Sequence, residues 1–139
     1  MKDFIPYGTQ WINEDDVNAV QSVLTSGFLT QGPSIAEFEK KIIEITGARF
    51  CVAVCNATQA LHIAVSALDL PKGSEGITTP ITFVASANCL PSNGLKAVFA
   101  DIDSRTYNIS PSSIRQKITD KTKVLIPVDY AGQAVDIDS

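Results

Sequence analysis

The chain from residue 48 onward alternates short apolar segments with segments of helical character. The expected strands span residues 50–54, 77–79, 96–100 and 123–128, and the expected helices between them span residues 57–70, 83–90 and 111–118. Strands that alternate with helices pair in parallel and are joined by right-handed crossovers. The sequence therefore predicts an α/β fold with a mainly parallel sheet and flanking helices.

Residues 1–47 lack this alternation and are expected to form two amphipathic helices. Asn13 precedes three acidic residues, which favours a helix start, and valines follow at helical spacing. Ser34 is the expected N-cap of the second helix, whose apolar face continues up to Gly47. We therefore expect an N-terminal helical segment over residues 1–47 and an α/β part over residues 48–139.

The composition favours a folded globular protein and argues against several partners. The 139 residues are 45% hydrophobic and carry a net charge of −4, which is unlike a disordered chain. A pI near 4.8 without a basic run offers no footprint for nucleic acid. No apolar stretch approaches the roughly 20 residues that span a bilayer, and no secretory signal is recognised. We expect a cytoplasmic protein with neither nucleic-acid nor membrane partners.

The thiols, the histidine and the lysines give no sign of a nucleophile or a metal site. Cys51, Cys55 and Cys89 lie in apolar surroundings and are expected to be reduced, buried thiols. His62 lies one turn inside an expected helix, where we expect a packing or helix-surface role. None of the lysines follows a strand in a Ser/Thr/Gly-rich turn that suits a buried reactive amine.

The last residues end differently from the rest of the chain. Residues 124–128 have the apolar pattern of a strand that is buried on both faces, but no complete helix follows to cover it. Residues 135–139 resemble the first turn of another helix. Open parallel sheets need helices on both faces. We therefore expect the chain to be the beginning of a larger domain.

Ligands of parallel α/β sheets bind beyond the carboxyl ends of the strands, where loops lead into helices. The first such loop contains Asn56, Ala57 and Thr58, whose small side chains and hydroxyl group suit an anion at a helix N-terminus. A tight turn without a ligand is the alternative. In the second loop, Phe83 could stack on a flat ligand or pack between helix and sheet.

The other two loops are polar. Asp101 and Asp103 follow a strand, where paired carboxylates either hold a metal or hydroxyl group or cap turns. Residues 129–133 bring further polar side chains to the end of the last strand.

Six motifs, taken in order, resemble one known family. They cover residues 28–33, 37–39, 55–62, 77–88, 99–103 and 126–133. Their order and spacing resemble the sugar-nucleotide aminotransferases of the DegT/DnrJ/EryC1/StrS family, from about Tyr7 to the last residue. These are pyridoxal 5'-phosphate enzymes of aminotransferase fold type I. The similarity is greatest to the branch that aminates C4 of UDP-linked 4-keto-6-deoxy sugars for surface glycans.

The resemblance implies which residues bind the cofactor. Asn56, Ala57 and Thr58 match the turn that holds the cofactor phosphate, and Phe83 matches the aromatic residue that stacks on the pyridine ring. Residues 48–139 would then be the first half of the cofactor-binding large domain.

The resemblance also implies a substrate-binding loop and partners. Tyr7, Thr30 and Gly32 match positions that contact the nucleotide-sugar substrate. Glutamate is the usual amino donor of the family, and its active site is built at a homodimer interface.

Two departures from the family's pattern concern the sheet and the catalytic centre. Gly76 replaces an apolar strand residue, which weakens the strand. The carboxylate that pairs with the pyridine nitrogen and the Schiff-base lysine both lie downstream of this chain, and Asp136 and Asp138 come too early to replace the carboxylate. The chain therefore holds no catalytic residue of its own, and we expect it to be inactive alone.

Three alternatives stay open at the level of sequence. A pyridoxal phosphate-dependent sugar dehydratase of the same superfamily has histidine in place of the lysine, at a position beyond this chain. A small non-catalytic module that binds a nucleotide sugar would be complete at 139 residues. A structural scaffold fits the site-like loops least well.

Overall fold

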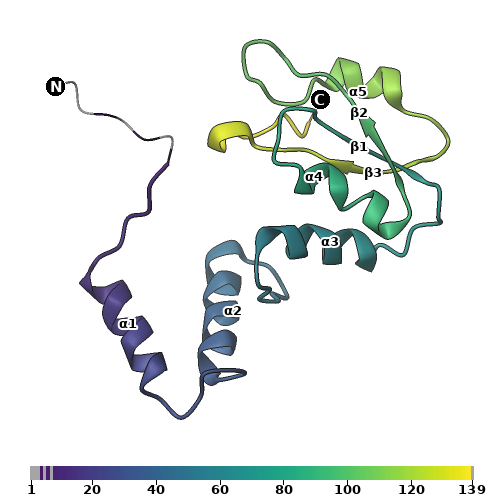
Figure 1. The fold of residues 1–139 in the computed structure, drawn as a ribbon. Coiled ribbons are helices and arrows are strands. Elements are labelled where there is room, and N and C mark those ends of the chain that lie inside the picture. Colours follow the sequence, from purple (N-terminus) through teal and green to yellow (C-terminus); the bar gives the residue numbers. More distant parts are fainter. Residues whose placement is uncertain (1–3, 5, 7, 139) are drawn as a thin grey trace. The chain divides into compact units, whose positions relative to one another are not determined.

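The computed structural model describes residues 4, 6 and 8–138 of the chain (Figure 1). The chain divides into two compact units, Met1–Ala53 and Val54–Ser139.

The first unit contains two helices whose ends follow from local sequence. Helix α1 (Glu14–Leu24) begins with a capping box, in which Asn13 Oδ1 accepts from the Asp16 amide at 3.1 Å and Asp16 Oδ2 accepts from the Asn13 amide at 3.0 Å. Helix α2 (Pro33–Thr46) starts with proline at its first position and ends where Gly47 adopts φ +71°. Both expected helices are confirmed.

Two sequence expectations for this unit were wrong. The N-cap of α2 is Gly32 and not Ser34, because Pro33 already occupies the first helical position. Residues 50–54 form no strand: Phe50 is 80% exposed, and the Ala53 amide donates to Glu39 Oε1 at 2.8 Å. A strand needs a pairing partner, and none of the described strands pairs with this segment.

The second unit contains a three-stranded parallel sheet, as predicted. Its strands are β1 (Glu75–Thr78), β2 (Lys96–Phe99) and β3 (Thr122–Ile126), in the order β2-β1-β3. Both pairs run parallel, so the carboxyl ends of the three strands meet at one edge of the sheet.

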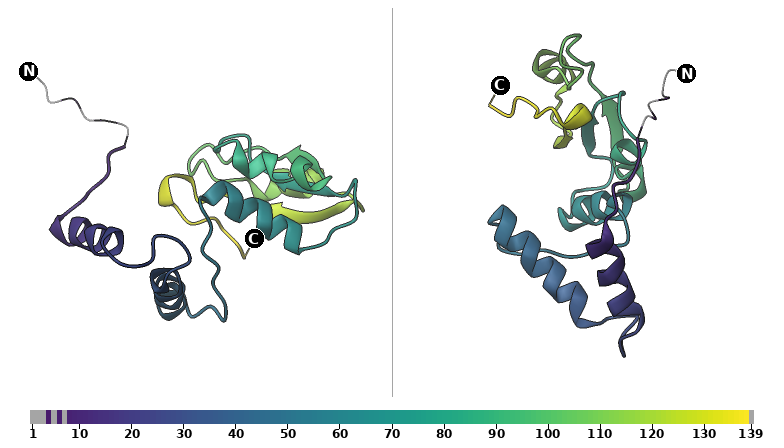
Figure 2. Two further views of the ribbon diagram at one scale, coloured as in Figure 1. Left: turned by 60° about the horizontal axis from the view of Figure 1, so that its bottom comes forward. Right: turned by 90° about the vertical axis from the view of Figure 1, so that its left-hand side faces the viewer.

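Helices cover both faces of this sheet (Figures 1 and 2). On one face lie α3 (Ala57–Ala67), α4 (Ala85–Asn88) and the 3-10 helix η1 (Pro91–Asn93), and on the other lies α5 (Pro111–Lys117). The core has two parts accordingly. Val65, Cys89, Leu90, Leu95 and Ile126 form one, and Ile77, Ala100 and Ile109 form the other.

Ser110 caps α5 by accepting from the Ser113 amide at 3.4 Å, as expected. After β3, only the short 3-10 helix η2 (Tyr130–Gly132) forms, and residues 135–138 do not begin the expected helix. Within the described part of the chain, no helix combines the length and the apolar character needed to cross a membrane.

The three cysteines differ from one another in exposure. All are free thiols, but only Cys89 is buried, whereas Cys51 is half-buried and Cys55 is exposed. The expectation of three buried thiols is therefore wrong for Cys51 and Cys55. Burial raises the pKa of the Cys89 thiol, which keeps it protonated.

Candidate functional site

The N-terminus of α3 presents backbone amides to solvent. Asn56 is its N-cap, and Asn56 Oδ1 accepts from the Gln59 amide at 2.9 Å. The Asn56 carbonyl accepts from the Ala60 amide at 3.1 Å. No described residue accepts a hydrogen bond from the amides of Ala57 and Thr58, as expected for the first turn of a helix.

This arrangement suits a phosphate group. Asn56, Ala57 and Thr58 are all exposed, so a ligand can reach both amides and the Thr58 hydroxyl. The small Ala57 side chain allows close approach, and the positive end of the helix dipole favours an anion.

The loop after β1 places an aromatic ring at the edge of the sheet. Thr79 is buried, and its Oγ1 accepts from the Ile81 amide at 3.3 Å, while the Thr82 and Ser86 hydroxyls are 2.9 Å apart. Phe83 precedes α4 instead of beginning the helix and is 73% exposed. Within this chain the Phe83 ring therefore does not pack between helix and sheet, and it is accessible for stacking.

A buried threonine joins the carboxyl ends of two strands below these loops. Thr78 Oγ1 donates to the Ile126 carbonyl at 2.8 Å, and Thr78 has no exposed surface. This hydrogen bond fixes the loop after β1 relative to the loop after β3. The α3 N-terminus and the segment after β3 lie at the same end of this unit in all views (Figures 1 and 2).

The carboxylates after β2 cap turns. Asp101 Oδ1 accepts from the Ile102 amide at 2.8 Å, and Asp103 Oδ1 accepts from the Arg105 and Thr106 amides, each at 3.0 Å. The hydrogen bonds from these two amides lower the pKa of Asp103. Of the two roles considered for these residues, the structure shows turn capping. The described residues contain no group of three or more metal-binding side chains.

Sequence reasoning missed Asn108, which is 6% exposed and hydrogen-bonds the loop after β3. Its partners lie 22 to 26 residues later in the chain, so no local pattern could indicate the contact.

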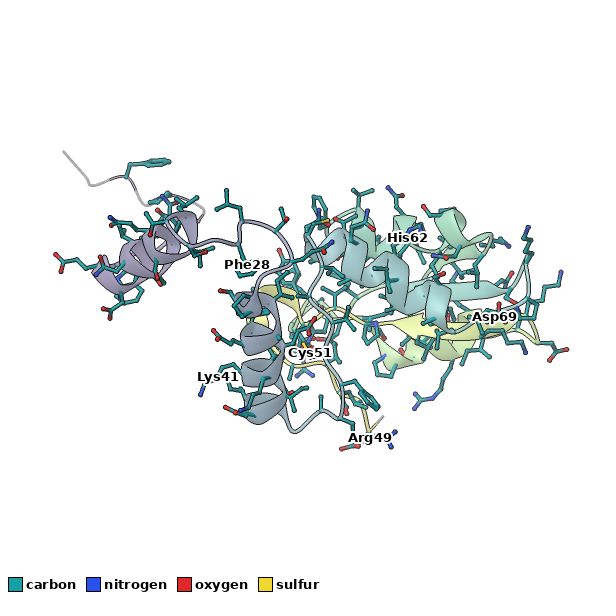
Figure 3. All side chains as sticks on the ribbon, turned by 90° about the horizontal axis from the view of Figure 1, so that it is seen from below. Phe28, Lys41, Arg49, Cys51, His62 and Asp69 are labelled. Carbon is teal, nitrogen blue, oxygen red and sulfur yellow. The ribbon has the colours of Figure 1, made fainter. Side chains whose placement is uncertain are left out.

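The expected substrate residues belong to the first unit. Thr30 and Gly32 lie in the loop between α1 and α2, together with Phe28, which Figure 3 labels. A Cβ atom on Gly32 would lie 2.9 Å from Phe28 Cβ, so the loop requires glycine there. Tyr7 lies outside the described residues.

The basic side chains of the second unit are spread over several elements. His62 is half-buried on α3 (Figure 3), and its carbonyl accepts from Asn93 Nδ2 at 3.2 Å. Lys117 ends α5 and lines a hollow together with Pro80 and Asp101, which follow β1 and β2. The other lysines of the unit flank the amino ends of the strands, namely Lys72, Lys96, Lys121 and Lys123.

Comparison with known proteins decides the family. The profile of the DegT/DnrJ/EryC1/StrS aminotransferase family matches residues 10–139. The chain belongs to this family. The resemblance inferred from the six sequence motifs is therefore confirmed, and so is the fold class, an N-terminal part of the fold of these aminotransferases.

Individual family members are similar over nearly the whole chain. The spore coat polysaccharide biosynthesis protein SpsC of Bacillus subtilis (strain 168) is 39% identical over 136 residues, which cover 98% of this chain and 35% of SpsC.

Two solved structures match the fold closely. The putative sugar aminotransferase Spr1654 of Streptococcus pneumoniae in its PMP form has a TM-score of 0.90 at 33% identity, covering 97% of this chain and 34% of that one. PseC of Helicobacter pylori, an aminotransferase involved in the biosynthesis of pseudoaminic acid, has a TM-score of 0.89 at 34% identity. The match covers 96% of this chain and 36% of PseC. The chain thus spans about a third of the length of these relatives.

The cofactor of this family is pyridoxal phosphate, and Spr1654 has been solved in a PLP form as well as a PMP form. The residues of this chain fit that group. The unpartnered amides of Ala57 and Thr58 suit its phosphate, and the exposed Phe83 ring suits its flat pyridine ring.

Proposed function

We propose that the full-length protein transfers an amino group to a keto sugar carried on a nucleotide, in the biosynthesis of a surface polysaccharide. Family membership and the polysaccharide role in the name of SpsC support the reaction class and the pathway. The observation that carries the proposal is the exposed pair of amides at the α3 N-terminus, at the end of the sheet where β1 leads into Phe83.

In this proposal four residues hold the cofactor. Asn56 fixes the first turn of α3 through its cap, and Ala57 and Thr58 donate to the phosphate from two amides and one hydroxyl. The Phe83 ring lies against the pyridine ring and excludes water from that face. Pyridoxal phosphate, when bound, supplies the electron sink that allows an amino group to move between donor and sugar.

The substrate side of the proposal rests on the first unit and on the dimer. Tyr7, Thr30 and Gly32 contact the nucleotide sugar, glutamate is the amino donor, and two copies of the protein form the active enzyme in the cytoplasm. The resemblance to the family supports the sugar substrate, the amino donor and the dimer.

We further propose that residues 1–139 do not catalyse transamination alone. The lysines of the second unit that flank the strands lie at their amino ends, opposite to the edge that carries Phe83. The resemblance to the family supports this proposal, because it implies that the Schiff-base lysine lies downstream of these residues.

The test uses the full-length protein with pyridoxal phosphate, glutamate and a UDP-linked 4-keto-6-deoxy sugar. We expect an amino sugar detected by mass spectrometry and stoichiometric 2-oxoglutarate. Loss of a sugar hydroxyl without gain of nitrogen would instead identify a dehydratase, and binding of the nucleotide sugar without turnover would identify a non-catalytic module. The same assay with residues 1–139 is expected to give no product.

A further inference from the structure

A buried asparagine ties together two loops at the carboxyl edge of the sheet. Asn108 lies between β2 and α5 and is 6% exposed. Its Nδ2 group donates to the carbonyl oxygens of Gln133 and Ala134, both at 3.0 Å, and its Oδ1 atom accepts from the Tyr130 amide at 3.0 Å. The side chain therefore uses both N–H groups and its oxygen on the loop after β3.

The position of Asn108 is itself well fixed. An antiparallel bridge pairs Ile102 with Ile109, which belongs to the core below α5. The Asn108 carbonyl accepts from the Asp103 amide at 2.9 Å, and the Asn108 amide donates to Thr106 Oγ1 at 3.4 Å. The side chain thus projects from a rigid anchor.

The loop that Asn108 holds contains strained backbone. Ala131 has φ +52° and Gly132 has φ +83°, and the first of these is an unfavourable conformation for a residue with a Cβ atom. Tyr107, next to Asn108, has φ +61°, and its ring lies 5.9 Å from the Tyr130 ring. A turn of this kind persists only where surrounding contacts hold it, and three of those contacts come from Asn108.

We propose that Asn108 is a positioning residue that holds the Tyr130–Gly132 turn in place as one wall of the substrate-binding edge. The turn follows β3, the strand beside β1, and lies at the same end of the unit as the α3 N-terminus (Figure 1). Ala57, Thr58 and Phe83 are assigned to the cofactor, and the turn, whose residues are exposed, is assigned to the nucleotide sugar together with the loop of Thr30 and Gly32. This inference rests on the proposed function.

The test compares Asn108→Ala with Asn93→Ala in the full-length protein. Asn93 is a matched control, because its Nδ2 group also donates to two carbonyls, those of His62 at 3.2 Å and Cys89 at 2.8 Å. It lies in η1, just before the amino end of β2 and away from the turn. Asn108→Asp is the second variant, since it keeps the side-chain volume and the acceptor for Tyr130 but removes both donors.

Hydrogen exchange and kinetics give independent readouts. We expect the amides of residues 128–136 to exchange at least 10-fold faster in both Asn108 variants and at the wild-type rate in Asn93→Ala. We also expect KM for the UDP-linked keto sugar to rise about 10-fold, with kcat and the affinity for pyridoxal phosphate changed less than 3-fold.

The outcomes separate this inference from the proposed function. A loosened turn with unchanged KM would show that Asn108 is merely structural, and a lowered cofactor affinity in place of a raised KM would overturn the assignment to the sugar. A wild-type protein that neither binds nor converts the nucleotide sugar would overturn the proposed function, and the role of Asn108 with it.

Discussion

Gly76 shows how a single missing Cβ atom can determine packing. A Cβ atom built there would lie 2.8 Å from Leu90 Cδ1 and 2.9 Å from Val124 Cγ1, both of which are closer than real contacts allow. The sequence suggested only that glycine weakens the strand. The structure shows that glycine also allows Leu90 to pack directly on β1, where Leu90 is fully buried.

Gly76→Ala is therefore expected to destabilise the full-length protein by about 1–3 kcal/mol, because the core must move to admit the methyl group. Chemical denaturation followed by circular dichroism measures the change. Gly27→Ala is the control, since among the described residues no heavy atom beyond its two chain neighbours lies within 4 Å of its Cβ position. Equal stability of the two variants would contradict the packing argument.

Thr58→Val tests the proposed phosphate turn. The substitution keeps the shape of the side chain and removes a hydroxyl that would donate to the charged phosphate, a bond worth about 1.5–3 kcal/mol. We expect the affinity of the full-length protein for pyridoxal phosphate, measured by absorbance titration, to fall by about 10-fold or more. Ser66→Ala, at an exposed position on the same helix, should leave that affinity unchanged.

At the scale of elements, one carboxylate joins the amino end of the sheet to the loop before β3. Glu75 Oε1 accepts from Lys96 Nζ at 3.2 Å, and Oε2 accepts from Thr119 Oγ1 at 2.7 Å. The hydrogen bond from Thr119, followed by that from Lys96, lowers the pKa of Glu75.

A lowered pKa in the folded state means that the charged form stabilises the fold. This contribution is present above the ordinary glutamate pKa of about 4.3 and is lost as the pH falls through the lower folded value. We expect Glu75→Gln to lower the urea midpoint of the full-length protein at pH 7, and the difference from wild type to shrink towards pH 3. Glu37→Gln, at an exposed position on α2, is the control. A difference that does not change with pH would contradict the prediction.

Three helices could be predicted from sequence because the signals at their ends are local. Helix α1 begins with the capping box of Asn13 and Asp16, and α5 begins with the Ser110 cap and Pro111. Helix α2 begins at Pro33 and ends at Gly47. The segment 50–54 failed because strand formation depends on a partner, which sequence periodicity does not reveal. Asn108 was missed because its partners are remote in sequence, although the loops that it joins were both recognised as candidate sites.

At the scale of the whole molecule, large apolar side chains remain uncovered. Trp11 is 82% exposed, Phe28 62%, Phe50 80% and Val52 74%, and neither α1 nor α2 contains a buried residue. Exposed apolar surface of this extent marks a region that packs against other protein or aggregates. Since the chain spans about a third of its relatives' length, these side chains are expected to be covered in the full-length protein.

Residues 1–139 expressed alone are therefore expected to self-associate and to bind a hydrophobic dye. The full-length protein should form no assembly larger than the dimer and should not bind the dye. Light scattering after size exclusion gives the mass, and dye fluorescence reports the exposed apolar surface. The double variant Phe50→Lys, Val52→Lys should reduce self-association of the short chain, because charge on an unpaired extended segment opposes edge-to-edge pairing. The control, Ser22→Lys with Gln59→Lys, adds the same charge at exposed polar positions and should have a smaller effect. A monomeric short chain that unfolds cooperatively and binds no dye would favour the non-catalytic module, because only a self-sufficient fold behaves in that way.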